Sequence, residues 1–248
     1  GAKRWVNIAG IQFQPSEAAK ILLILFFAQF IMKYKDKLNT LPVLGACVVL
    51  ILIPWYLVFD QPDLSTSIVL IVIFCIVIFA GGLSWKIILG ILAVAIPAFV
   101  ILISIALKPG TEYLADYQKN RILAFINPEE YALDEALQQL NSVTAIASGM
   151  LDGKGYKNNE ITSVINGNYV SQPQTDFIFA VIGEEFGFKG SVLVIVLIIG
   201  IALECISIGR QSSDLAGQII ASGMGGLIAF QGFINIGVAT FILPTTGL

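Results

Sequence analysis

The stretch TDFIFAVIGEEFGFKGSVLVIVLIIGIALECIS, residues 175–207, decides the fold of this chain. Its second half is almost wholly apolar and long enough to cross about 30 Å of hydrocarbon as a helix. Its first half carries Asp176 at the start and Glu184 and Glu185 inside. Because GEEFGFKGS interrupts the apolar run, the sequence predicts a short half-helix followed by a spanning helix from about residue 190.

The rest of the chain has the same apolar character. Hydrophobic residues make up 56% of its 248 positions and charged residues 12%. A soluble globular protein cannot bury that much apolar surface, so we expect an all-α, polytopic membrane protein built as a helical bundle. Six membrane segments are predicted, at about 16–32, 41–59, 64–83, 85–107, 177–208 and 217–242. No basic tract is present, so nucleic acid is not an expected partner.

The residue types that are missing or scattered narrow the chemistry. The chain has no histidine, which excludes Ser-His-Asp and Cys-His nucleophiles and histidine-ligated metals. Cys47, Cys75 and Cys205 lie singly in apolar runs and are interpreted as buried structural residues. Acid–base groups must therefore come from Asp, Glu, Lys or Tyr. No metal site and no cofactor is predicted, although a divalent cation bridging a pyrophosphate and a carboxylate is chemically reasonable.

The charges of the short loops predict how the chain crosses the membrane. Residues 33–39, KYKDKLN, carry three lysines and are expected in the cytoplasm, whereas DQPD at 60–63 has two acids and no base and is expected outside. Residues 108–176 then form a long extracytoplasmic loop, and loops of this length are usually functional. The polar motifs therefore gather on the outer face.

The string QPSEAAK, residues 14–20, has two interpretations. Pro15 and Glu17 suit the electropositive start of a helix, and Lys20 follows on nearly the same face. The pair is then either a capping arrangement with a snorkelling lysine or a charged pair lining an outward-facing cavity.

Other candidates also have structural alternatives. Asp63 suits a helix N-cap after a tight turn, and Arg121 suits either a loop ion pair or a phosphate contact. GMLDGKG, which contains Lys154, resembles a phosphate-binding loop only loosely. Asp176 is either a helix cap or a carboxylate at a membrane mouth, where apolar neighbours and a nearby lysine favour proton abstraction.

Several strings together resemble the SEDS family (shape, elongation, division and sporulation), which includes RodA, FtsW and SpoVE. They occur in family order along the whole chain: GAKRW, FQPSEAAK, QPDLSTS, RILAFINP, SVTAIASGMLDGKG, TDFIFAVIGEEFGF, NIGV and LPTTGL. The resemblance implies that residues 1–248 are a fragment of a single SEDS-type transmembrane domain, without the N-terminal and last membrane helices. One departure from the family pattern is Met150, which stands where a second glycine is usual.

The resemblance implies a peptidoglycan glycosyltransferase that polymerises lipid II with inversion, at the outer face of the bacterial cytoplasmic membrane, during elongation or division. A class B penicillin-binding protein is the implied partner. Asp176 matches the family's essential acid and Lys20 the lysine of its QPSE motif; Glu17 completes the catalytic candidates. The candidates for substrate binding are Gln14, Ser16, Gln61, Asp63, Arg121, Lys154, Glu184 and Glu185. A lipid II flippase is the alternative, since charged groups and a broken helix also suit a transport path. A scaffold whose partner does the catalysis is a third possibility.

Overall fold

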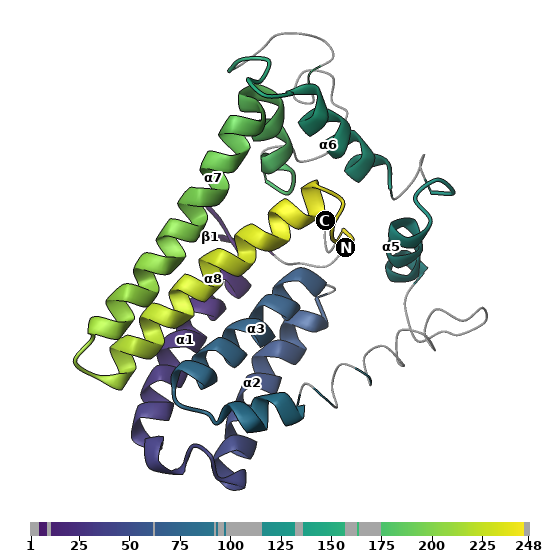
Figure 1. Ribbon diagram of the computed structural model, residues 1–248. Coiled ribbons are helices and arrows are strands. Elements are labelled where there is room, and N and C mark those ends of the chain that lie inside the picture. The colour runs from purple at the N-terminus through teal and green to yellow at the C-terminus, as the bar shows by residue number, and fades with distance from the viewer. Residues whose placement is uncertain are drawn as a thin grey trace. The chain divides into compact units, whose positions relative to one another are not determined.

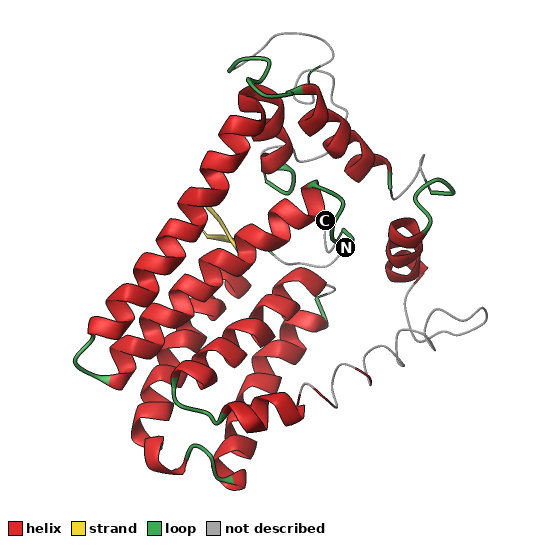
Figure 2. Ribbon diagram, in the orientation of Figure 1, coloured by secondary structure: helices red, strands yellow, loops and turns green. Residues whose placement is uncertain are grey.

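The computed structural model describes residues 5–8, 11–61, 63–91, 93, 97, 116–131, 136–156, 163 and 175–245. Helices dominate these residues (Figure 2), as the all-α prediction requires. A short antiparallel hairpin of β1 (Val6–Ile8) and β2 (Ile11–Phe13), in which Val6 pairs with Phe13 and Asn7 with Gln12, was not predicted from the sequence. Each strand has only three residues, which is too short for a clear alternating pattern.

Figure 1 shows the helices along the chain. They are α1 (Pro15–Lys33), the 3₁₀ helix η1 (Lys35–Lys37), α2 (Leu41–Phe59), α3 (Leu64–Ala80), α5 (Asp116–Ile126), α6 (Leu137–Ser148), α7 (Ile178–Gln211) and α8 (Leu215–Ala239). Residues 85–91 are also helical, but most of the predicted segment 85–107 and much of the predicted loop 108–176 lie outside the described residues. By length and composition α1, α2, α7 and α8 can each cross a membrane, and α3 is a shorter apolar helix. The chain is a multi-pass membrane protein.

Local chemistry explains where several helices begin. Pro15 lies in the first turn of α1, with Glu17 near the electropositive N-terminus, and Lys33 lies in the last turn. Asp63 caps α3 by accepting a hydrogen bond from the Thr66 backbone N–H. Asp214 plays the same part for α8, since its carboxylate accepts from the Gly217 N–H at 2.8 Å.

The chain packs as two compact units, and each is described by itself. Unit 1 comprises Gly1–Gly90 and Ile198–Gln231, and unit 2 comprises Ile91–Leu197 and Gly232–Thr246. Helices α7 and α8 contribute one part to each. In unit 1, α3 packs against α1 and α2. Small residues bring α8 close to them, because a Cβ on Gly223 would meet Ile24 and Val77.

The core of unit 2 joins the start of α7 to α6 and to the end of α8. Its buried members are Ala145, Phe177, Phe179, Ala180, Val238 and Ala239. Further along the chain, α7 is broken at Gly187. This residue has φ 63° and ψ −160°, a conformation open essentially to glycine alone. The predicted interruption within GEEFGFKGS is thereby confirmed.

Candidate functional site

The first polar cluster lies at the start of α1, on the helix face that packs inward. Ser16, Lys20, Ile24, Phe27 and Ile31 are buried at helical spacing along one stripe. Lys20 therefore carries its ammonium into the packed interior, with 2% of its side chain exposed, and this group lies 2.7 Å from Glu17 Oε1. Glu17 lies beside the stripe and is 52% exposed. The buried ammonium thus pairs with a carboxylate that also reaches the surface.

The same end of unit 1 joins the QPSE and QPD strings. The Gln14 side-chain amide donates to Asp63 Oδ2 at 3.3 Å, across 49 residues of sequence. Asp63 is buried and also accepts from the Thr66 N–H at 3.0 Å and from the Thr66 hydroxyl at 2.9 Å. The N-cap interpretation of Asp63 is therefore confirmed. Gln61 is exposed in the preceding turn.

Ser16 differs from its neighbours because its hydroxyl is buried and, within the described part of the chain, accepts and donates no hydrogen bond. A buried hydroxyl without a partner costs about 1–3 kcal/mol. It lies in the first turn of α1, beside Gln14 and Glu17 in sequence.

The second polar cluster is in unit 2, where the glycine loop (residues 149–155) lies against the break in α7. The Lys154 and Gly155 N–H groups donate to the Glu184 and Glu185 carbonyls at 2.9 and 3.0 Å. On the other side of the break, the Phe188 N–H donates to the Met150 carbonyl at 2.8 Å. A broken helix leaves backbone groups without intrahelical partners, and the loop supplies partners for them.

A buried ion pair reinforces these backbone contacts. The Lys154 ammonium lies 2.9 Å from Glu184 Oε1, and the two side chains are 19% and 3% exposed. Glu184 and Glu185, which are candidates for substrate binding by sequence, can either line a cavity or hold the half-helix. Their carbonyl contacts, with the burial of both side chains, favour the second role.

Glycine is required where the loop meets the helix. A Cβ on Gly149 would lie 1.9 Å from the Gly183 carbonyl oxygen, and one on Gly153 would lie 2.2 Å from that of Glu185. Gly187 is equally restricted, since its Cβ would lie 2.4 Å from the Gly153 nitrogen. The glycines of SGMLDGKG thus serve close backbone packing, and none of the described contacts requires a phosphate.

Asp176 lies in the turn that enters α7 and is half-buried. Its backbone carbonyl accepts a hydrogen bond from the Asn235 amide at 3.1 Å, and the Thr175 carbonyl accepts from the same nitrogen at 3.2 Å. The next residue, Phe177, is 2% exposed and belongs to the core of unit 2. The turn is therefore held from both sides of the aspartate.

The end of α8, which carries Asn235, is held in turn by α6. The Gln139 amide is buried and donates to the carbonyls of Val238 at 2.9 Å and Leu243 at 2.8 Å. The Ser142 hydroxyl donates to the Ala239 carbonyl at 2.8 Å. Val238 and Ala239 are in the last turn of α8, where carbonyls have no intrahelical donor.

Helix α5, which carries Arg121, reaches the same region. Phe125 stacks on Phe241 just after α8, with ring centroids 5.7 Å apart. The side chain of Arg121 lies outside the described part of the structure, so its phosphate contact stays a prediction. The lysine expected near Asp176 is Lys20, and their pairing also stays a prediction, because Lys20 belongs to unit 1 and Asp176 to unit 2.

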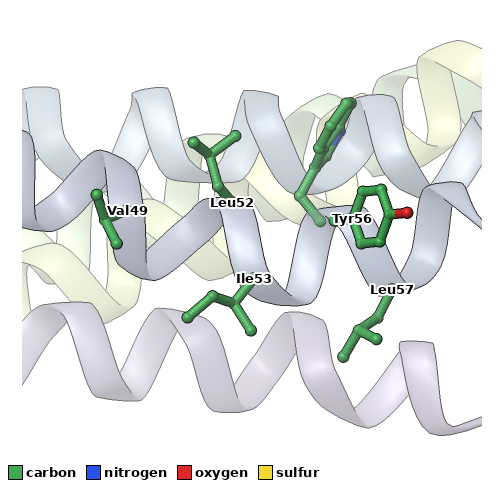
Figure 3. Close-up of a pocket in the computed structure, with 6 residues that line it drawn as sticks. Val49, Leu52, Ile53, Tyr56 and Leu57 are labelled. Carbon is green, nitrogen blue, oxygen red and sulfur yellow. The ribbon is translucent and has the colours of Figure 1, made fainter.

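A hollow on α2 is lined almost entirely by apolar atoms. Val49, Leu52, Ile53, Trp55, Tyr56 and Leu57 line it, and Figure 3 shows them projecting from one helix. This surface suits contact with lipid or with another apolar helix. Among the described residues no group of three or more Asp, Glu or Cys side chains could hold a metal ion.

Comparison with known proteins identifies the family of this chain. The family model for FtsW, RodA and SpoVE, described as "Cell cycle protein", matches residues 1–248. The chain belongs to the FtsW/RodA/SpoVE family.

Family members from distant bacteria match the whole chain. Peptidoglycan glycosyltransferase MrdB of Escherichia coli (strain K12) is 34% identical over 248 residues, and stage V sporulation protein E of Bacillus subtilis (strain 168) is 31% identical over 253. A probable peptidoglycan glycosyltransferase FtsW of Haemophilus influenzae is 33% identical over 254 residues. The chain spans 64%, 64% and 61% of these three relatives, respectively.

Two solved structures share the fold of this chain. One is described as "Structural coordination of polymerization and crosslinking by a peptidoglycan synthase complex". It has a TM-score of 0.75 and 26% sequence identity to this chain, and the match covers 100% of this chain and 66% of the solved chain. The other is a crystal structure of rod shape determining protein RodA from Thermus thermophilus, with a TM-score of 0.58. At 22% identity over all of this chain and 61% of that one, it supports the fold alone.

The sequence predicted no role for three residues of this site: Gln139, and Ser142 and Asn235, which begin the strings SVTAIASGMLDGKG and NIGV. A signal was available for Asn235, because an amide inside an apolar membrane helix is costly unless it is hydrogen-bonded. Gln139 and Ser142 are spaced three apart on α6, which places both on one face. Nothing local indicates that this face meets the end of α8.

Proposed function

We propose that the protein containing this chain is a peptidoglycan glycosyltransferase, which polymerises lipid II at the outer face of the bacterial cytoplasmic membrane. The observation that carries the proposal is the placement of Asp176. It is a half-buried carboxylate in a turn at the start of an apolar helix, and the backbone on both sides of it is fixed. Lipid II has a polar head and a lipid tail, so a base acting on its sugar must lie where water meets hydrocarbon.

The reaction is a glycosyl transfer with inversion. The acceptor sugar hydroxyl attacks the anomeric carbon of the lipid-linked donor strand and forms the new glycosidic bond. The bond between that carbon and the pyrophosphate oxygen breaks, and undecaprenyl pyrophosphate leaves with its electron pair. Asp176 takes the hydroxyl proton as the general base, a role that typically contributes about 10²–10⁴-fold to the rate.

The unit 1 cluster has a separate task in this proposal. Lys20 and Glu17 form an ion pair that reaches from the interior of unit 1 to its surface, and their charges are assigned to the catalytic step. Gln14 and Ser16 at the start of α1, with Gln61 and Asp63 of the QPD string, bind the polar part of the substrate. The buried Ser16 hydroxyl, unpartnered within the described residues, supports this role, because a substrate oxygen would satisfy it.

The unit 2 groups divide into two roles. Arg121 binds the pyrophosphate, for which a planar guanidinium is well suited. Lys154, Glu184 and Glu185 hold the broken helix and so keep the entrance to α7 in place. A class B penicillin-binding protein is the proposed partner, supported by the similarity to a synthase complex in which polymerization and crosslinking are coordinated.

A polymerisation assay in detergent tests the activity. The full-length protein, purified with its transpeptidase partner, is incubated with lipid II in detergent, where no compartments exist and flipping has no meaning. Glycan strands that depend on the full-length protein support the enzyme. If none form, while the same protein moves lipid II across the membrane of a vesicle, a flippase is the correct function. Strands formed by the partner alone would instead indicate a scaffold.

A further inference from the structure

The Asn235 side chain connects α8 to the turn that carries Asp176. We infer that Asn235 is a positioning residue, whose amide sets the place of the Asp176 carboxylate for catalysis. This inference rests on the proposed function of Asp176 as the general base, and it adds a residue that the sequence motifs did not single out for a role.

The geometry of the contact is specific to an amide. Asn235 Nδ2 donates to the Asp176 carbonyl at 3.1 Å and to the Thr175 carbonyl at 3.2 Å. A primary amide nitrogen has two N–H groups, so a single side chain can satisfy two consecutive carbonyls. A carboxylate in its place has no donor and repels both oxygens.

These hydrogen bonds do not serve helix capping. The groups that a helix start leaves without partners are N–H groups, whereas Asn235 binds carbonyls that precede α7. At the helix start itself, the Ala180 N–H donates to the Phe177 carbonyl at 2.9 Å. The amide therefore fixes the path of the chain before the helix, which is where Asp176 lies.

A second contact shows that α8 acts as the template for this turn. Val238 and Ala239 lie three and four residues after Asn235, on the same face of α8, and they pack in one core with Phe177. The backbone of Asp176 is thus held by the amide, and the following side chain is held one helical turn further along. Gln139 and Ser142 of α6 fix that end of α8.

The expected size of the effect follows from how strictly catalysis depends on position. A general base must lie within hydrogen-bond reach of the proton it takes, and a displacement of about 1 Å can cost about 100-fold in rate. Substrate binding depends on other groups, so we expect the loss in kcat and little change in KM.

The experiment uses the full-length protein with its transpeptidase partner and measures initial rates of polymerisation against lipid II concentration. Asn235→Asp, of nearly the same size but without the donor, should lower kcat about 10–100-fold and leave KM within about twofold. Asn235→Gln, which keeps the amide on a longer stem, should recover part of the rate. Thr240→Val is the matched control and should behave as wild type, because it removes a 2.7 Å hydrogen bond from the residue after α8 to the Ile236 carbonyl, which is not part of the turn that carries Asp176.

A readout that does not depend on activity is hydrogen–deuterium exchange at the amides of residues 178–181. Exchange there should be faster in Asn235→Asp than in Thr240→Val. Unchanged exchange, or a wild-type kcat in Asn235→Asp, would overturn the inference. If Asn235→Asp does not give monodisperse protein, Asn235→Gln and Asn235→Ser undergo both measurements, with the larger defect expected in the serine variant. Failure of the proposed function is distinct, since it appears as a wild-type rate in Asp176→Asn.

Discussion

The ammonium of Lys154 lies 2.9 Å from a carboxylate oxygen of Glu184, a side chain that is only 3% exposed. The pair joins the glycine loop to α7 three residues before the break at Gly187. Removing one member of a buried ion pair leaves the other charge without compensation, which is costlier than removing both. This contact therefore predicts how stability depends on the pair.

Glu184→Gln should lower the free energy of unfolding by about 3–5 kcal/mol, because Lys154 stays charged in a mostly buried place. The double variant Glu184→Gln with Lys154→Met should regain much of that loss. Thermal or denaturant unfolding in detergent measures both. Lys189→Met is the control, since its ion pair with Asp152 is 73% and 76% exposed and should contribute less than about 1 kcal/mol. Equal losses in all three variants would contradict the buried-pair account.

Two residues with positive φ at the contact between α7 and the glycine loop, Gly187 and Met150, predict opposite effects on stability when they are substituted. Gly187→Ala should lower the unfolding temperature, because its φ of 63° strains an L-residue and the new Cβ would meet the Gly153 nitrogen at 2.4 Å. Met150→Gly should raise the free energy of unfolding by about 1 kcal/mol, since Met150 is exposed and has φ 49°.

Gly200→Ala is the matched control for Gly187→Ala, because it lies in the same helix with no atom within 4 Å of its Cβ. It should leave the unfolding temperature unchanged or raise it. A decrease as large as that of Gly187→Ala would mean that the break is not the cause.

The helices were predictable because apolar runs and their terminating residues are local signals. The run at 41–59 is the helix Leu41–Phe59, and Asp63 caps α3 as its position after DQP suggested. The break inside GEEFGFKGS was visible as a cluster of glycines and charges within a membrane segment. Each of these features depends on residues that are close in sequence.

The contacts that build the site were not predictable because they join distant parts of the chain. Gln14 and Asp63 are 49 residues apart, and Gln139 meets carbonyls 99 and 104 residues away. Nothing in the sequence around Lys154 and Glu184 indicates that these two residues pair with each other, so each was predicted only as a candidate for substrate binding. Packing in three dimensions decides such pairings.

Lys20 and Arg121 should differ in their kinetic effects. Lys20 is 2% exposed and anchored in α1 beside Glu17, so Lys20→Met should lower the maximal rate without recovery at high substrate. Arg121 is proposed to hold the pyrophosphate, so Arg121→Ala should raise KM, and part of the rate should return as lipid II increases. Polymerisation rates against lipid II concentration measure both variants. Identical defects would show that the two residues do not have separate roles.

The central claim is that Asp176 is the general base, and Asp176→Asn in the full-length protein tests it most directly. The variant is purified with its transpeptidase partner, and its polymerisation of lipid II is measured in detergent beside Asp152→Asn, an exposed acid of the glycine loop. We predict that Asp176→Asn loses at least about 100-fold in rate at an unchanged unfolding temperature, while Asp152→Asn retains the wild-type rate. A wild-type rate in Asp176→Asn would contradict the account.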